Sequence, residues 1–569
     1  MALILALLVP AVSGVWLLGV ARTARAAEGH LIALGASVAT FVLTLLVAWL
    51  RPEVNAQWVP ALGLRWHFAV DGISMPLVLL TSALTVAVVV HSRGREPGRG
   101  VRGGGTGGGA AVEAGAVEAG AVEVGGAAST FYACLLLVEF AALAAFLARD
   151  AIAFFIAFEL VLIPMWVLIS RFGDQHVSKA VRADASNRFV FFTVLGSTLM
   201  LLGILVLVTS SGTSDLTVLA ARHGAGIPQG TQVLVAALLV TGLGIKVPIW
   251  PAHTWLPPAH TVAPTAGSVL LAAVLLKMGT YGIVRLALPT VPQGFATVAP
   301  YLAACGAIGI IWGGLACLVE RDLKRLVAYS SVAHMGFVAL GLASGTRTGL
   351  QAALFANIAH GLVSALLFFV VGGLKERWGS ADLTVARAAL RESSPRMGYA
   401  LVVGLAAALG LPGLVGFWGE FLAVYAAWSP AAGRPEGLFR LLAVLAVCGI
   451  ALAAGYALRV LRLVWAGRPE APEASSEDSS EGHIRIKESR FGARIGRFFD
   501  ADVGGERALG DARGREWGVI AVLVAAVIAA GVMPRPLLSL TSTEASAIIT
   551  GVVTGGRAPA SSTTVQAGR

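Results

Sequence analysis

LVTGLGIKVPIWPAHTWLPPAHTVAPTAGSVLLAAVLLKMGTYGIVRL, residues 239–286, is the stretch that decides how this chain folds. It predicts two apolar helices joined by a Pro-rich turn, with Lys246 in the first helix and Lys277 in the second. A charge near the centre of a bilayer costs about 2.5–3.5 kcal/mol on insertion scales, so both lysines are candidate functional groups. The alternative is a lysine that reaches water from a helix end. Apolar residues extend past Lys246 on both sides, which favours the functional interpretation.

Two prolines predict that the first of these helices is broken close to Lys246. Pro248 and Pro251 each remove an amide and free the carbonyl four residues earlier, on Gly244 and Val247. A broken helix at membrane depth persists where it is buried in protein or lines a wet cavity, and in transporters it marks the binding site. The alternative is a proline kink without a function.

The composition of the whole chain excludes an ordinary soluble domain. Of 569 residues, 57% are hydrophobic and 13% are charged, whereas about a quarter are charged in soluble proteins. Apolar runs of about 18 residues or more recur along the chain, and each is long enough to span a bilayer. We therefore expect an all-α polytopic membrane protein with about 14 transmembrane helices. The predicted spans are 2–20, 30–50, 70–91, 129–148, 151–170, 188–210, 231–253, 262–286, 297–318, 323–345, 349–374, 398–428, 438–465 and 517–534.

The distribution of basic residues predicts the orientation. The net charge of +10 comes mostly from arginines and lysines in the loops that follow odd-numbered spans. The positive-inside rule places those loops in the cytoplasm and both termini outside, so the charge does not call for nucleic acid. The four cysteines form no CxxC pair, and neither an iron–sulfur cluster nor a zinc site is expected.

Composition also divides the chain. Residues 93–127 are Gly-rich and then repetitive, which predicts a low-complexity linker. Residues 466–516 form a second polar loop, in which 484–499 is a candidate amphipathic helix for the membrane surface. The predicted units are 1–128 with three helices and the Gly-rich loop, 129–286 and 297–465 with five helices each, the loop 466–516, and 517–569 with the last helix and tail.

A few further ionisable residues fall within predicted spans. Glu159 lies in an apolar helix five residues before Pro164. A carboxylate and a lysine that are buried together ionise each other and become neutral when they are separated, which is the minimum a proton relay needs. A purely structural partner is the alternative. Glu139 is also intramembrane but has no helix break beside it, and Asp71 is expected to cap or border its helix.

The second half of the chain contains two histidines and one more interrupted helix. His334 and His360 suit a relay because imidazole exchanges protons near neutral pH, although a hydrogen-bonded core histidine is the alternative. Pro412 and the glycines around it predict a break two turns before Glu420. Interrupted helices in both halves of a chain are typical of an internally repeated transporter. His253 and His260 lack the further ligands that a metal site needs.

The ordered motifs GIKVPIWPAHTWLPPAH, APTAGSVLLAAVLLKMGTYGIVRL, DLKRLVAYSSVAHMGF, IAHGLVSALLFF and LPGLVGFWGEF resemble the antiporter-like membrane subunits of respiratory complex I and of multisubunit cation/proton antiporters. The resemblance covers about residues 65–535 and departs from the family pattern at Pro258, where the family has an acid. It implies two inverted repeats of five helices with discontinuous helices. It also implies a proton route through Glu159, Lys246, Lys277, His334, His360 and Glu420.

The resemblance carries further expectations. In the family that the chain resembles, the last proton carrier is a lysine in subunits L and N and a glutamate in subunit M. Glu420 occupies that position here, so the chain is similar to the M type. Subunits L and N are then the expected neighbours, together with lipid. No cofactor is expected in this chain, since NADH, FMN, iron–sulfur clusters and quinone would bind other subunits. The expected location is the bacterial inner membrane. The alternatives are a subunit of a multisubunit Na⁺/H⁺ antiporter and a membrane scaffold that does not pump.

Overall fold

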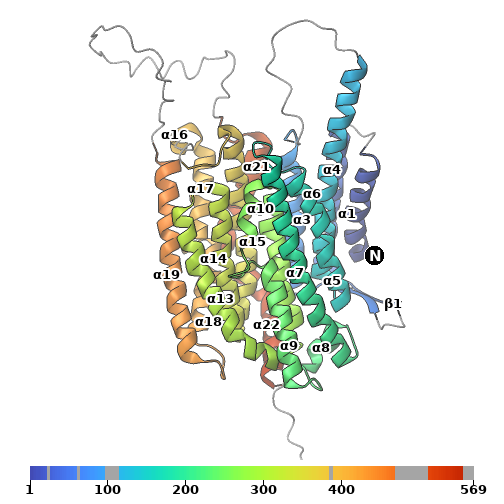
Figure 1. Cartoon of the computed structure of the whole chain (residues 1–569), viewed down its shortest axis with the longest axis vertical. Coiled ribbons are helices and arrows are strands. Elements are labelled where there is room, and N and C mark those ends of the chain that lie inside the picture. The colour runs from blue at the N-terminus through green and yellow to red at the C-terminus, as the bar shows by residue number, and fades with distance from the viewer. Residues whose placement is uncertain (22–25, 60–63, 96–113, 384–388, 468–509, 555–569) are drawn as a thin grey trace, which may run out of the picture.

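The helices of the chain stand side by side as one bundle with a common long axis (Figure 1). The computed structural model describes residues 1–21, 26–59, 64–95, 114–383, 389–467 and 510–554. The N-terminal elements are α1 (Ala2–Gly19), α2 (Ala26–Leu50), β1 (Glu53–Val59), β2 (Leu64–Ala69), α3 (Ser74–Ser92) and α4 (Ala114–Leu147).

The middle of the chain follows with α5 (Ala151–Leu160), α6 (Leu162–Ser170), α7 (Lys179–Ser211), α8 (Leu216–Arg222), α9 (Gln229–Lys246), α10 (Leu256–Val262), α11 (Thr265–Leu270), the π-helical turn η2 (Leu271–Leu275), α12 (Leu276–Gly282) and the π-helical turn η3 (Ile283–Ala287). The last part consists of α13 (Pro292–Val319), α14 (Leu323–Ala343), α15 (Arg347–Trp378), α16 (Leu390–Ser393), α17 (Pro395–Ala408), α18 (Val415–Trp428), α19 (Glu436–Val460), the π-helical turn η4 (Leu461–Trp465), α21 (Gly514–Val532) and α22 (Arg535–Thr554).

The predicted all-α membrane architecture is confirmed. Within the described residues, 13 helices are long and apolar enough to cross a membrane. Helices α17 and α18 together occupy the remaining predicted span, 398–428, and they are separated by the unwound residues 409–414. The count of crossings therefore agrees with the sequence, with boundaries that differ by several residues.

Each predicted break lies where the prolines place it. Helix α9 ends at Lys246, so the span predicted as 231–253 is helical only in its first part, and Pro248 and Pro251 lie in the unwound residues beyond. Pro412 lies between α17 and α18. Counted from α4 and from α13, the broken crossing is the fourth in each group of five. The inverted symmetry of the two groups stays a prediction, as does the division into the five units.

Acidic and hydroxyl side chains fix where several helices begin. The Asp150 carboxylate accepts hydrogen bonds from the amides of Ile152 and Ala153 at 2.9 and 3.0 Å, and this cap starts α5. Asp322 caps α14 in the same way, and Thr346 caps α15. Such caps satisfy amides that the first helical turn leaves without partners, and they hold the crossings that carry the candidate site in a fixed register.

A two-stranded hairpin was not predicted. Strands β1 and β2 pair antiparallel, and the rings of Trp58 and Trp66 lie 4.6 Å apart between centroids. The alternation of apolar and polar residues in EVNAQWV and LRWHFA is the signal of this hairpin. This short hairpin is an addition to the all-α bundle and lies between the crossings α2 and α3.

Two further elements correct the predicted linkers. Helix α4 begins at Ala114, so the second part of the linker predicted at 93–127 is helical. Alanine, valine and glutamate there tolerate a helix that the following span already nucleates. Residues Arg535–Thr554 of the predicted tail form α22, which the sequence did not indicate. The candidate amphipathic helix at 484–499 and the Gly-rich residues 96–113 lie outside the described residues.

Asp71 caps its helix, as expected, and also pairs with two arginines. Its carboxylate accepts from the amides of Ile73 and Ser74 at the start of α3, and it pairs with Arg149 at 2.8 Å and with Arg285. Burial by itself would raise the pKa of the Asp71 carboxyl, but the two guanidinium groups more than offset that effect, so the pKa lies well below its usual range. The carboxylate thus stays charged and ties the start of α3 to η3 and to the segment that follows α4.

Candidate functional site

Glu159 and Lys246 come together where two crossings are interrupted. Glu159 is the second-last residue of α5, just before the junction with α6, and Lys246 is the last residue of α9. Lys246 is buried, with Nζ 4.9 Å from the ring centroid of Phe158 and 5.7 Å from that of Phe189. Aromatic faces attract a cation. Glu159 is close enough to act electrostatically on Lys246, but among the described residues the two make no direct ion pair.

Pro248 and Pro251 were predicted to free the carbonyls of Gly244 and Val247, and the first of these accepts a hydrogen bond from beyond the break. The Gly244 carbonyl accepts from the amide of Ile249 at 2.9 Å. The Ile245 carbonyl accepts from the indole of Trp255, also at 2.9 Å. Buried backbone oxygens are satisfied wherever a donor can reach them, and Trp255 from the WLPPAH segment reaches this one. The ammonium of Lys246 therefore faces aromatic rings and Glu159.

Lys277 is fully buried between two π-helical turns, η2 and η3. Its Nζ donates to the carbonyl of Ala272, inside η2, at 2.7 Å. Nζ also lies 2.5 Å from Nδ1 of His360 on α15. Single π-turns inside helices occur mostly at functional positions. Here the π-turn supplies the oxygen that holds the ammonium of Lys277 against the imidazole.

Both predicted histidines and Glu420 continue from Lys277. The rings of His360 and His334 lie 5.6 Å apart between centroids, on α15 and α14. Nδ1 of His334 lies 2.9 Å from Oε1 of Glu420, which α18 contributes after the second break. Lys277, His360, His334 and Glu420 thus form a line across four helices, which we call the Lys277–Glu420 line.

A small cavity lies along this line. It measures about 20 Å³ and is lined by His334, His360 and Glu420 together with apolar residues, of which Phe337 is the largest. The Nε2 atoms of both histidines are buried and have no hydrogen-bond partner among the described residues. A water molecule needs about 10–15 Å³ and two or more polar partners. The cavity meets both conditions.

The two lysines belong to separate groups. Among the described residues no hydrogen bond or ion pair joins the Glu159 and Lys246 group to the Lys277–Glu420 line. Their helices nevertheless touch, because a Cβ on Gly279 of α12 would lie 2.7 Å from Cγ2 of Val247 and 2.8 Å from the carbonyl oxygen of Leu243. Only glycine permits so close an approach. A shift of either helix would therefore change the surroundings of the lysine on the other helix.

Two further buried groups, which the sequence did not single out for proton transfer, belong to the site. Lys324, in the first turn of α14, is 3% exposed, and its Nζ donates to the Ala263 carbonyl at 2.9 Å. His260 of α10 is fully buried on the ring of Phe368 and interacts electrostatically with both Lys324 and Lys277. The available signal is its place in the first turn of the predicted span 323–345, where a lysine also fits the pattern of basic residues that border a span.

Glu139 is fully buried on α4, and neither of its carboxyl oxygens has a hydrogen-bond partner among the described residues. Glu139 takes part in neither of the two groups described above, which agrees with the absence of a helix break beside it in the sequence.

Gly410 offers a test of the turn that holds Glu420. It has φ +72°, and a Cβ there would lie 2.5 Å from Oε2 of Glu420. If Glu420 belongs to the proton route that the resemblance implies, Gly410→Ala should displace the carboxylate and reduce proton translocation by about tenfold or more, since a misplacement near 1 Å costs up to about 10²-fold. The measurement is dye-monitored proton uptake by inverted membrane vesicles, normalised to the amount of assembled complex.

Gly413→Ala is the matched control in the same turn. Gly413 has φ +90°, and nothing lies within 4 Å of the position that a Cβ would occupy there. The substitution adds the same left-handed strain of about 1–2 kcal/mol without touching Glu420. Equal losses in the two variants would show that strain alone matters and would contradict a role for the position of the carboxylate.

The chain is similar to known membrane subunits over most of its length. Residues 148–434 match the family described as NADH:quinone oxidoreductase/Mrp antiporter, TM. A relative from Synechococcus sp., NAD(P)H-quinone oxidoreductase chain 4 1, is 33% identical, and the match covers 84% of this chain and 78% of the relative. NADH-quinone oxidoreductase subunit M of Rhodobacter capsulatus is 33% identical, with 76% of this chain and 79% of that subunit covered.

Two solved structures have a similar fold. A chain of respiratory complex I from Thermus thermophilus with bound NADH superposes with a TM-score of 0.75 at 26% identity, and the match covers 97% of this chain and all of that one, 100%. A chain of the Mrp complex from Dietzia sp. DQ12-45-1b superposes with a TM-score of 0.75 at 20% identity, covering 97% and 99%. The second likeness concerns the fold alone.

Proposed function

Because this chain belongs to the NADH:quinone oxidoreductase/Mrp antiporter transmembrane family, we propose that it is the M-type subunit of an NADH–quinone oxidoreductase and translocates protons. It would do so in the bacterial inner membrane, with the basic loops in the cytoplasm and both termini outside. NADH oxidation and quinone reduction would take place in other subunits, with no redox cofactor in this chain. Antiporter-like subunits of the L and N types would be its neighbours.

The observation that carries the proposal is the Lys277–Glu420 line. When Lys277 is charged, its ammonium donates to Nδ1 of His360, which leaves the proton of that imidazole on Nε2. His360 borders the cavity that His334 also lines. One water there would connect the two Nε2 atoms, and Nδ1 of His334 would pass a proton on to Glu420.

In this proposal, Glu159 and Lys246 regulate proton transfer along the Lys277–Glu420 line. When Glu159 is close, its carboxylate stabilises the charge on Lys246, and when Glu159 withdraws, that stabilisation is lost. Movement of charge at Lys246 changes the field at Lys277, and the contact of Gly279 with Val247 links the two helices mechanically. The cytoplasmic side would load the line through Lys324 and His260, and Glu420 would release the proton outside.

Vesicles distinguish this function from the alternatives. In inverted vesicles that contain the assembled complex, we propose that NADH acidifies the interior equally well with and without Na⁺. A subunit of a Na⁺/H⁺ antiporter would instead exchange Na⁺ for protons in vesicles that lack NADH dehydrogenase activity. A scaffold would keep full pumping when the charges of the Lys277–Glu420 line are neutralised, and that result would refute the proposal.

A further inference from the structure

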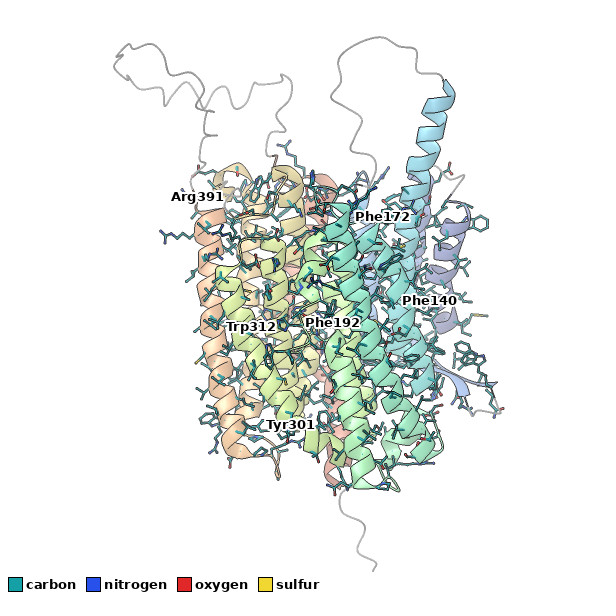
Figure 2. The ribbon with its side chains drawn as sticks, in the orientation of Figure 1. Phe140, Phe172, Phe192, Tyr301, Trp312 and Arg391 are labelled. Carbon is teal, nitrogen blue, oxygen red and sulfur yellow. The ribbon has the colours of Figure 1, made fainter. Side chains whose placement is uncertain are left out.

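An open basic cavity lies at one end of the bundle, and it shares no lining residue with the cavity along the Lys277–Glu420 line. It occupies about 370 Å³ between the end of α6 and the start of α7. Its lining includes the cations Arg171, Lys179 and Arg182 and the indole of Trp166, and no carboxylate takes part. Phe172, which follows Arg171, lies toward the same end of the bundle as Arg391 and away from Tyr301 (Figure 2).

Arg182 makes this cavity a built site. Its side chain is only 8% exposed, and Nη1 donates to Gln175 Oε1 at 2.6 Å and to the Asp174 carbonyl at 3.2 Å. Its Nε is buried and has no partner among the described residues. Two carboxylates near it in the sequence are engaged elsewhere, Asp174 with Lys375 and Asp184 with Arg188 of its own helix. Three cations that share one cavity without a carboxylate attract an anion, and planar guanidinium groups suit phosphate in particular.

The surface next to the cavity is apolar. On α6, Ile163 is 70% exposed and Trp166 is 40% exposed, and on α7, Phe191 is 67% exposed. Both helices are membrane crossings, Ala151–Ser170 and Lys179–Ser211, and the cations lie at their ends. Tryptophan favours the level of the lipid headgroups. Along the same two helices, cationic groups that can hold an anion are thus followed by apolar side chains that can pack against acyl chains.

We propose that this cavity binds the phosphate headgroup of an anionic phospholipid of the cytoplasmic leaflet. Arg171, Lys179 and the buried Arg182 hold the phosphate, and Trp166 packs beside the glycerol region. The acyl chains lie along Ile163 and Phe191. Free phosphate has the same headgroup chemistry, but it gains nothing from the exposed apolar residues below the cavity. Basic pockets on the cytoplasmic side of membrane helices are a recognised kind of lipid site.

A photo-crosslinking phosphatidylglycerol tests the proposal in the intact, detergent-purified complex. The labelled peptide is identified by mass spectrometry, and we expect it to come from α6 and the start of α7. Unlabelled phosphatidylglycerol should compete, whereas phosphatidylcholine and inorganic phosphate should not. In the double variant Arg171→Gln/Lys179→Gln, the apparent affinity should fall about 25-fold, since each cation contributes about fivefold, or about 1 kcal/mol.

Two variants complete the design. Arg321→Gln removes one exposed cation from the loop between α13 and α14, outside the cavity, and should leave the labelling unchanged. Arg182→Gln should abolish it, and its thermal unfolding is measured because this residue is buried. The double variant of Arg171 and Lys179 remains decisive if Arg182→Gln does not fold.

Three results would overturn the proposal. Equal labelling by phosphatidylcholine would indicate ordinary lipid contact, and full competition by inorganic phosphate would indicate a site for free anions. Loss of a neighbouring subunit from the double variant, with labelling unchanged, would show that these cations hold a protein. The outcome is independent of proton pumping, because labelling is measured without NADH.

Discussion

Proton translocation by the assembled complex is expected to fall by about 10²-fold or more when Lys277 is replaced by methionine. Lys277 is fully buried, and its ammonium joins the Ala272 carbonyl to the imidazole of His360. Methionine fills a similar volume but carries no proton, and a positioned proton-transfer group contributes about 10²–10⁴-fold. The measurement is NADH-driven quenching of a pH-sensitive dye in inverted vesicles, with the amount of complex determined by blotting.

Lys277→Arg separates a proton carrier from a fixed positive charge. Arginine keeps the charge and the hydrogen-bond donors, but it does not lose its proton at accessible pH. A carrier role therefore predicts that Lys277→Arg pumps as poorly as Lys277→Met, while the complex still assembles. Pumping at the normal rate in Lys277→Arg would contradict that role, because only a fixed charge would then be required.

Lys246→Met is expected to abolish pumping as well, for a different reason. Lys246 lies at the break after α9, over the rings of Phe158 and Phe189 and within electrostatic reach of Glu159. The substitution leaves Glu159 without its partner and removes the charge that would act on Lys277. The same vesicle assay measures the effect. Here Lys246→Arg should retain a substantial part of the activity, since the proposed role needs a charge rather than a transferable proton.

Glu159→Ala completes a double-mutant cycle with Lys246→Met. If the two residues act as one unit, each single variant loses pumping, and the double variant is no worse than either. Independent, additive losses would show that Glu159 and Lys246 serve separate functions. Retention of full pumping in both single variants would remove the pair from the mechanism altogether.

Much of the architecture can be predicted from the sequence because it depends on local chemistry. Long apolar runs have only one way to satisfy their backbone in lipid, so the crossings are predicted within several residues. Pro248 and Pro412 cannot continue a helix, and both breaks follow directly. The candidate carriers are found because an ionisable side chain is rare in such surroundings.

The arrangement of those carriers is a tertiary property, and the sequence left it open. Nothing in the residues around His360 indicates that its Nδ1 meets Lys277, which is 83 residues away along the chain. Nor does any pattern distinguish Lys324, buried against the Ala263 carbonyl, from the basic residues that merely border a span. The aromatic rings that lie next to the ammonium of Lys246 are likewise supplied by α5 and α7 together, which no local pattern indicates.

The π-turn η2 has a consequence for anyone who rebuilds this crossing. A π-turn accommodates one residue more than the α-helical repeat, and one residue corresponds to about 100° of rotation around a helix axis. Straightening Leu271–Leu275 into regular helix would therefore turn every side chain beyond it, Lys277 included, toward another face of the bundle. The direction of the Lys277 ammonium therefore depends on the one additional residue in η2. Deleting a single residue there would change this direction, although no substitution of a side chain is involved.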